Sequence, residues 1–506
     1  MNQPLPQDYD NPKHLLKRLH VDSEGNWAAR GQEMALNLFH DVAKRVPAYK
    51  DFLSKNDVNP ADVKTIDDFK NIPTVDKDNY LRRYSRADLC WDGKFSEQNW
   101  MISATSGSTG EPFYFPRQPL QDKQYALTAE LYLLENFDID KKRTLYINAF
   151  PLGIWIGGLF TYEAIYEILL KPDYQLSLAN PGINIPEVIK TVRNLGKDFD
   201  QVIIGAYGPF LKDIIDEGIE QGIVWKDYNP GFVLSAEAFS ELFRDYVYEK
   251  TGVSDVYRRS LNHYGTVDLG TMSHETPACL LTRRLALQNE KLYQEIFPQT
   301  SHLPTLTQYM PEMFYFEDMD GNLLCTANSG IPLVRYDLKD RGRVIALEEL
   351  GEAYGRAGLN LDEELKKAKI DQTLWQLPFV YVYERSDFSV SFFAFQIYPA
   401  TIRKALFDTT LQESLTGKFT MKVDYDAKGV QHFYVHVEMK HGTQSSQKLS
   451  NSVADKIIEQ LLEESSEYRK VFTEYGKERV MPEVTLWPYQ DPTYFRSGGK
   501  QKWVVK

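Results

Sequence analysis

The order of apolar and polar positions divides the 506-residue chain into three parts. From about residue 30 to 85 it predicts helices with polar connections, and Pro47 ends one of them because proline disfavours helix continuation. From about residue 100 to 345, short β-rich runs alternate with helical stretches. The last part, about 120 residues, follows a third pattern. A chain of this length exceeds one compact core, so we expect at least two domains.

The middle part predicts a layered α/β structure. Its β-rich runs include residues 144–147, 202–204 and 232–234, and helical stretches at 209–218 and 237–249 follow two of them. Such alternation is typical of a largely buried sheet between layers of helices.

The C-terminal part predicts a hairpin followed by a helix. The two arms of the hairpin flank a turn at residues 426–429, and their alternating apolar residues are Phe419, Met421, Val423 and Tyr425, then Phe433, Val435, Val437 and Met439. This alternation gives the hairpin one buried face, and Val453, Ile457 and Leu461 share one face of the helix. We therefore expect an α/β fold with a large layered N-terminal domain of mixed sheets and helices (residues 1–384) and a small α+β C-terminal domain (residues 385–506).

Composition narrows the possible partners. The chain carries 58 Lys+Arg against 71 Asp+Glu, a net charge of -13 that repels phosphate backbones, so nucleic acid is not expected. The cysteines Cys90, Cys279 and Cys325 are widely spaced and form no CxxC pair, which fits a reducing cytoplasm. Residues 1–6 lack a signal segment, and the most apolar stretch, residues 149–160, is too short to span a bilayer. We expect a soluble, cytoplasmic protein without a membrane partner.

A loop rich in glycine, serine and threonine is the strongest local signal. It consists of Thr105, Ser106, Gly107, Ser108, Thr109 and Gly110. Glycines let the backbone turn tightly and expose N–H groups, while hydroxyls add donors that suit a phosphate. The loop lacks the GK[ST] of a P-loop, and on composition alone it also fits a polar surface loop.

Three further segments are suited to parts of a nucleotide. In residues 262–268 an aromatic ring could stack on a base and a carboxylate could hold Mg²⁺; a buried tyrosine before a turn glycine is the alternative. In residues 335–340 a carboxylate could accept ribose hydroxyls, whereas a solvated charged turn explains the same residues. In residues 495–502 glycines could place a lysine on a mobile tip near an α-phosphate, and a disordered basic tail is the alternative.

All four segments occur in one chain in a fixed order. In this order the chain resembles the phenylacetate–CoA ligase and capsule-ligase-like branch of the adenylate-forming enzymes, which include acyl-CoA synthetases, adenylation domains and luciferases. The resemblance extends from about Val46 to Lys500. Residues 46–49 and 71–77 look like the N-terminal signature of that branch, and residues 384–387 match the hinge to a small, mobile C-terminal domain.

The resemblance implies ATP-dependent formation of an acyl-AMP and a role for each matching residue. The catalytic residues would be Lys500, Asp268 and Thr266. The nucleotide would contact the loop at 105–110 together with Ser235, Ala236, Glu237, Asn262, Tyr264, Gly265, Asp340 (on the ribose) and Arg385. Mg²⁺ would be held by Asp268 with help from Glu237, the hinge would be Asp387, and the acid pocket would include Phe150, Trp155, Gly157 and Tyr207. These aromatic side chains favour an aryl or apolar acid, although aromatic-rich segments also serve as core.

The chain departs from the family at two places. The tyrosine–glycine motif ends in Ser/Thr-Glu in the family and in Val267-Asp268 here, so the carboxylate is one methylene shorter and the hydroxyl is lost. After the hinge, Phe388, Phe393 and Ala394 stand where the family has an acidic residue, a basic residue and a glycine near the pantetheine tunnel. Bulk there disfavours CoA as acceptor, whereas the same phenylalanines would also fit the core of the small domain.

Three functions remain open. In the first, CoA is the expected acceptor of an acid–CoA ligase that uses ATP, Mg²⁺ and a small carboxylic acid. In the second, an amine or a carrier-protein thiol takes the acyl group. The third is a non-catalytic descendant that only binds nucleotide, which the retained Asp268, Asp340 and Lys500 argue against. A zinc site at Cys279 and His274 lacks a partnering pair of ligands.

Overall fold

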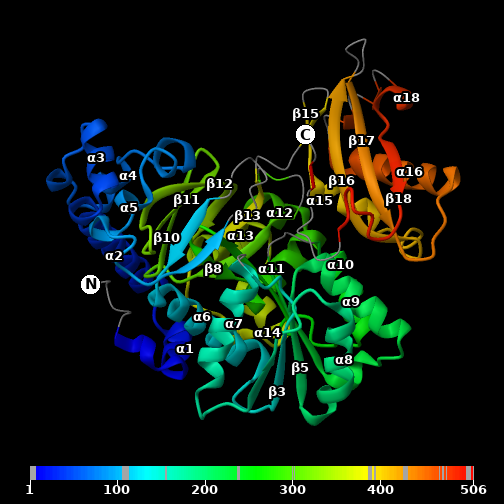
Figure 1. Cartoon of the computed structure of the whole chain (residues 1–506), viewed down its shortest axis with the longest axis horizontal. Helices are drawn as coiled ribbons and strands as arrows, with labels where there is room; N and C mark the ends of the chain where they lie inside the picture. The colour runs from blue at the N-terminus through cyan, green and yellow to red at the C-terminus, as the bar shows by residue number, and fades with distance from the viewer. Residues whose placement is uncertain are drawn as a thin grey trace.

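The computed structural model describes residues 7–104, 113–153, 156–235, 240–298, 300, 303–385, 390–392, 395–425, 431–465, 468–469, 472–473, 476–496 and 503–504. Among these residues, a sheet of 11 strands runs through the larger part of the molecule and a sheet of three strands forms the C-terminal part. Figure 1 shows the three-stranded sheet, in orange and red, set apart from the larger body.

Five strands on one side of the large sheet are parallel. Their order is β4 (Leu176–Ala179), β3 (Thr144–Asn148), β5 (Gln201–Ala206), β6 (Pro230–Leu234) and β7 (Ser260–Thr266). The strands read as continuous apolar runs because both faces are covered. On β5, Ile203 packs with helices α6 (Pro119–Phe137) and α7 (Ile156–Leu169). Its neighbour Ile204 packs on the other face with α8 (Ile185–Leu195), α9 (Gly208–Glu220) and α10 (Glu241–Thr251).

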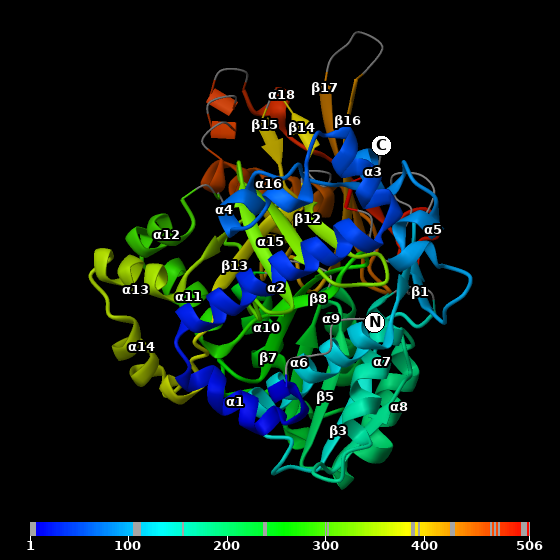
Figure 2. The same ribbon diagram turned by 90° about the vertical axis from the view of Figure 1, so that its left-hand side faces the viewer.

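The other strands of the large sheet are antiparallel. They are β8 (Gly270–His274), β9 (Thr305–Tyr309), β13 (Phe379–Arg385), β12 (Leu333–Ile345), β11 (Asn322–Ala327) and β10 (Phe314–Met319). One face carries the N-terminal helices α1 (Pro12–Val21), α2 (Glu24–Arg45), α3 (Pro47–Lys55), α4 (Ile66–Lys70) and α5 (Arg86–Leu89). The opposite face carries α11 (Pro277–Gln288), α12 (Glu290–Ile296), α13 (Leu347–Arg356) and α14 (Leu361–Ala368). Figure 2 shows α2 crossing in front of this half of the sheet.

The C-terminal unit, by which we mean the described residues from 390 onward, has its own core. It contains β14 (Val390–Phe392), β15 (Phe395–Ile397), α15 (Pro399–Leu406), β16 (Leu415–Tyr425), β17 (Gln431–Met439), α16 (Gln447–Glu464), α18 (Lys477–Val480) and β18 (Glu483–Trp487). The predicted hairpin is confirmed, since Phe419 pairs with Val437 and Met421 with Val435. The sequence did not reveal that β18 joins β17 as a parallel third strand.

Most predicted elements are present, with one shifted boundary. The helix expected at residues 237–249 begins at Glu241, because the hydroxyl of Ser240 accepts the N–H of Phe243 at 3.3 Å and caps the helix; residues 236–239 lie outside the described residues. The predicted break at Pro47 is confirmed, since α2 ends at Arg45 and α3 starts at that proline. The mixed α/β architecture is therefore as expected. Among the described helices, none combines the length and apolarity needed to cross a membrane.

Candidate nucleotide and acid site

The residues predicted to bind nucleotide and acid collect at one edge of the sheet. Phe150 follows β3, Tyr207 follows β5, Ser235 follows β6 and Thr266 ends β7. Because these strands are parallel, their carboxyl ends meet at the same edge. In open α/β sheets this edge is where ligands bind.

The predicted acid-pocket residues lie on adjacent strand ends. Phe150 is 3% exposed, and a Cβ added to Gly157 at the start of α7 would lie 3.9 Å from its side chain. Gly205, near the end of β5, leaves room for the same ring, because a Cβ there would approach Phe150 to 3.0 Å. Two residues later, Tyr207 precedes α9 and stacks on Phe210 with ring centroids 5.7 Å apart. Phe150 therefore lies against the end of β5 and the start of α7, and Tyr207 lies against Phe210 of α9.

Two hydrogen bonds join the predicted adenine and ribose segments. The phenol of Tyr264 on β7 donates to Asp340 Oδ2 on β12 at 2.7 Å. In the reverse sense, the phenol of Tyr336 on β12 donates to Asp268 Oδ2, in the turn after β7, at 2.5 Å. Asp268 and Asp340 are buried. The predicted metal-binding and ribose-binding carboxylates are therefore each held by a tyrosine of the other segment.

The charged-turn alternative for residues 335–340 is wrong. These residues lie within β12, and Arg335 is buried against Glu317, with Nε donating to the carboxylate at 3.2 Å. The alternative for Tyr264, a buried tyrosine before a turn glycine, describes part of what is observed, since its ring stacks on Phe316. Gly265 is needed for close approach, because a Cβ there would lie 2.5 Å from the carbonyl oxygen of Gly270.

Lys77, which the sequence analysis did not single out, lies beside a predicted site residue. Its ammonium lies 3.4 Å from Asp268 Oδ2. The preceding Val75 fixes this position by bridging β12: its N–H donates to Arg335 O at 3.2 Å and its carbonyl accepts from Asp337 N at 2.8 Å. The signal was present in the sequence, since Lys77 ends the N-terminal segment 71–77 that suggested the family.

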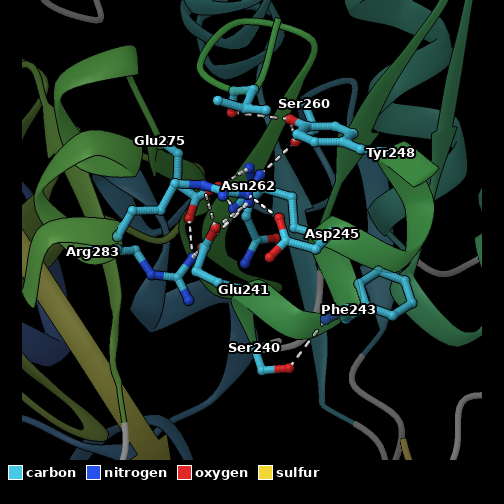
Figure 3. Close-up of polar contacts among 12 residues, drawn as sticks. Ser240, Glu241, Phe243, Asp245, Tyr248, Ser260, Asn262, Glu275 and Arg283 are labelled. Carbon is cyan, nitrogen blue, oxygen red and sulfur yellow. Dashed lines mark hydrogen bonds and ion pairs between the residues drawn. The ribbon is translucent and has the colours of Figure 1, made fainter. Parts of the chain in front are cut away.

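A buried network of charged side chains holds the backbone of β7 in place (Figure 3). Glu275 accepts the backbone N–H of Asn262 at 2.9 Å, Arg244 at 2.7 Å and Arg283 at 2.6 Å. Both arginines also pair with Glu241, at 3.1 Å and 2.9 Å. Burial raises the pKa of Glu241, but the neighbouring arginines outweigh it and hold the pKa below its ordinary value. The network ties α10, β7 and α11 together, so it fixes Asn262 two residues before Tyr264.

Another buried arginine, Arg117, lies at the end of the strand that follows the predicted phosphate loop. That loop connects β1 (Met101–Ala104) and β2 (Tyr114–Arg117). Arg117 donates to Ser103 Oγ at 2.5 Å, to Asp122 at 3.1 Å and to Glu163 of α7 at 2.9 Å. Burial and the nearby Asp122 carboxylate raise the pKa of Glu163 to about 7, against the opposing effect of Arg117. The ends of the loop are thereby tied to the helix that follows Phe150.

Several predicted residues lie outside the described residues. They are Thr105, Ser106, Gly107, Ser108, Thr109, Gly110, Trp155, Ala236, Glu237, Asp387 and Lys500. Arg385 is described by its backbone, which pairs with Asp340 across β12 and β13. Phe393 and Ala394 are likewise outside, but their neighbour Phe392 packs in the core of the C-terminal unit, 5.8 Å from the ring of Phe433.

The zinc alternative at Cys279 and His274 was not favoured by the sequence. Within the described part of the chain, no group of three or more His, Cys, Asp or Glu side chains could hold a metal ion. The thiol of Cys279 lies 3.3 Å from the hydroxyl of Thr276, and burial raises its pKa to about 12. It is therefore a protonated core thiol at neutral pH.

No family model and no curated protein sequence matches the chain. Solved structures do share its fold. 2-Hydroxyisobutyryl-CoA ligase in the postadenylation state, in complex with R3-HIB-AMP, superimposes with a TM-score of 0.66 and 11% identity over 97% of this chain and 91% of that chain. An acyl acid amido synthetase in complex with 2,4-DB gives 0.61 and 13% over 100% and 95%.

Other states of the same ligase fit less well. The TM-score is 0.56 for the thioesterification state, at 12% identity over 100% of this chain and 94% of that chain, and 0.51 for an open conformation, at 11% over 96% and 91%. The chain has the fold of the adenylate-forming ligases.

Proposed function

We propose that this protein is an ATP-dependent ligase that activates a carboxylic acid as its acyl-AMP and then transfers the acyl group to CoA. The observation that carries this proposal is the pair of hydrogen bonds from Tyr264 to Asp340 and from Tyr336 to Asp268. These bonds tie together the two segments that we propose for adenine, ribose and metal. The sequence signatures at 46–49 and 71–77 favour the phenylacetate–CoA ligase branch.

The first half-reaction needs positioning and charge stabilisation. An oxygen of the substrate carboxylate attacks the α-phosphorus of ATP, the bond to the β-phosphate oxygen breaks, and pyrophosphate leaves with that electron pair. In this proposal Asp340 binds the ribose and Lys500 stabilises the charge on the α-phosphate. In the second half-reaction the acceptor's sulfur attacks the acyl carbon, loses its proton, and AMP leaves.

The residues present fit a magnesium ion that accompanies ATP. Mg²⁺ is usually bound through one or two carboxylates plus substrate phosphates, and it neutralises phosphate charge. Asp268 supplies one carboxylate, and Glu237 is proposed as its helper. Lys77, 3.4 Å from Asp268, adds a positive charge at the same place, so it would favour the polyphosphate.

An amine or a carrier-protein thiol is the alternative acceptor. Two observations favour it: the fold is shared with an acyl acid amido synthetase, and Phe393 and Ala394 replace residues expected near a pantetheine tunnel. Against this, Phe392 packs in the core of the C-terminal unit. CoA-dependent turnover tests whether the neighbouring substitutions leave the pantetheine tunnel open.

The acid is proposed to be aryl or apolar, because the proposed pocket residues Phe150 and Tyr207 are aromatic and lie at neighbouring strand ends. The test is pyrophosphate release with ATP and a panel of aryl, branched and linear acids, followed by CoA, amino acids and a carrier protein as acceptors. We expect release to depend on one class of acid and thioester formation to depend on CoA. A purified protein that binds ATP but releases no pyrophosphate with any acid would contradict the proposal.

A further inference from the structure

A lysine of the C-terminal unit is buried against the large body. Lys418 on β16 donates to Asp213 Oδ2 on α9 at 2.7 Å and lies 3.5 Å from Glu438 Oε2 on β17. The three side chains are 14%, 9% and 0% exposed. Glu438 is further held by the hydroxyl of Thr416 and the backbone N–H of Gln490, each at 2.7 Å. One ammonium therefore lies between two buried carboxylates that belong to different units.

A second pair and an aromatic contact extend this interface. Lys440, directly after β17, lies 3.4 Å from Asp216, which is one turn along α9 from Asp213. Phe407, which follows α15, packs edge-on against Phe243 of α10 with ring centroids 5.5 Å apart. Figure 1 shows α9 and α10 directly below the C-terminal unit. The contact is thus a defined surface with a polar centre and an apolar side.

The buried ion pair at the polar centre favours this arrangement of the two units. Burying a charge is costly unless a partner compensates it. Burial lowers the pKa of Lys418, but Asp213, Glu438 and the nearby Tyr207 raise it above its ordinary value, so the ammonium stays charged. If the C-terminal unit moved away, Lys418 and Asp213 would each lose that partner and both would have to be hydrated.

We propose that Lys418 and Asp213 form a latch that positions the C-terminal unit on α9 and sets the balance between acid activation and acyl transfer. α9 begins directly after Tyr207, a proposed pocket residue, so the latch contacts the helix that borders the acid site. The part concerning the two half-reactions rests on the proposed function. The part concerning the arrangement of the two units does not.

The first test measures that arrangement without any activity. Spin labels at Glu220→Cys on α9 and Lys448→Cys on α16, both exposed positions, report the distance between the units. The native cysteines are all buried, so labelling is selective. We expect Lys418→Met and Asp213→Asn to shift or broaden the distance distribution and Lys418→Arg to retain it. A distribution identical to that of the unsubstituted chain in both charge-removing variants would overturn the latch.

The matched control is an ion pair of similar length within one unit. Lys404 Nζ lies 2.9 Å from Glu464 Oε1, both in the C-terminal unit, so Lys404→Met should leave the distance unchanged. A shift as large as that of Lys418→Met would mean that the effect is not specific to the interface, and would overturn the proposal. If Lys418→Met does not fold, Lys440→Gln tests the same interface at a more exposed pair.

The second test compares the half-reactions. For Lys418→Met we expect the ratio of acid-dependent pyrophosphate exchange to acyl transfer from supplied acyl-AMP to change roughly tenfold or more, as when one partner of a buried charge pair is removed. Lys418→Arg should restore the ratio. An unchanged ratio despite altered distances would overturn the functional part of the latch. Absence of pyrophosphate exchange in the unsubstituted chain would instead count against the proposed function alone.

Discussion

At the scale of single residues, the candidate site depends on two phenols that hold two carboxylates. Tyr264 and Tyr336 donate to Asp340 and Asp268 in opposite directions between β7 and β12. A phenol that donates to one carboxylate oxygen fixes the orientation of the carboxylate and leaves the other oxygen as an acceptor site for a ribose hydroxyl or a cation.

Replacement of Asp340 tests the ribose assignment. A hydrogen bond to a charged group contributes about 1.5–3 kcal/mol, so Asp340→Ala should weaken ATP binding by about 10-fold to 150-fold. Tyr264→Phe removes the phenol and keeps the ring, and should have a smaller effect. Calorimetric titration with ATP measures both, and Asp362→Ala at an exposed position of α14 is the control. An unchanged dissociation constant for Asp340→Ala would refute the ribose assignment.

Glu163 predicts a pH dependence of stability. Its pKa rises from 4.5 to about 7 in the folded protein because it is half-buried and lies near the Asp122 carboxylate. The folded state then binds the proton more tightly than the unfolded state. The free energy of unfolding should therefore fall as pH rises from about 4.5 to about 7 and change no further above that.

Urea unfolding of Glu163→Gln at several pH values checks this sign. The stability of the unsubstituted protein relative to this variant should be highest at the acidic end of the interval. Glu167→Gln, exposed on the same helix, should behave as the unsubstituted protein. The difference in the free energy of unfolding between the unsubstituted protein and Glu163→Gln should change over about two pH units, from about pH 5 to about pH 7. A constant difference over that interval would contradict the raised pKa.

At the scale of elements, the charge network beneath β7 is the support on which the nucleotide segment rests. Glu275→Gln removes a carboxylate shared by Arg244, Arg283 and the backbone of Asn262. Breaking a buried pair in this way costs about 3–5 kcal/mol, so we expect a loss of that size in the free energy of unfolding. Denaturant titration measures it, with Glu249→Gln on the exposed side of α10 as control. A loss no larger than that of the control would show that the network is not structural support.

The elements themselves could be predicted because their signals are local. Alternation gave the hairpin β16–β17, and Pro47 gave the break between α2 and α3. The Tyr264–Asp340 and Tyr336–Asp268 contacts span 76 and 68 residues, and no local pattern encodes such pairs. For the same reason the sequence suggested a charged turn at 335–340: Arg335 is tolerated inside a strand because Glu317 on another strand compensates it.

At the scale of the whole molecule, the C-terminal unit is expected to carry the catalytic lysine. Lys500 lies outside the described residues, but the chain is packed on both sides of it, with Phe495 and Trp503 buried. The backbone carbonyl of Trp503 accepts the N–H of Met421 at 2.8 Å, and its ring lies 4.8 Å from that of Phe419. Residues 503–504 are therefore anchored on β16, the strand that also carries Lys418, rather than belonging to a free tail.

This anchoring leads to the prediction for Lys500. A lysine between the anchored residues Phe495 and Trp503 is expected to move with the C-terminal unit. It can then serve the first half-reaction and be withdrawn for the second, as in other hinge motions. Removing a group that stabilises transition-state charge typically costs about 10²–10³ in rate. We therefore expect Lys500→Ala to lower acid-dependent pyrophosphate exchange by that factor, while acyl transfer from supplied acyl-AMP remains near that of the unsubstituted protein.

The control is Lys477→Ala, which replaces an exposed lysine in the same unit. Equal exchange rates for Lys500→Ala and the unsubstituted protein would refute the assignment, and an equal loss in both half-reactions would mean that Lys500 acts on folding or on the arrangement of the units.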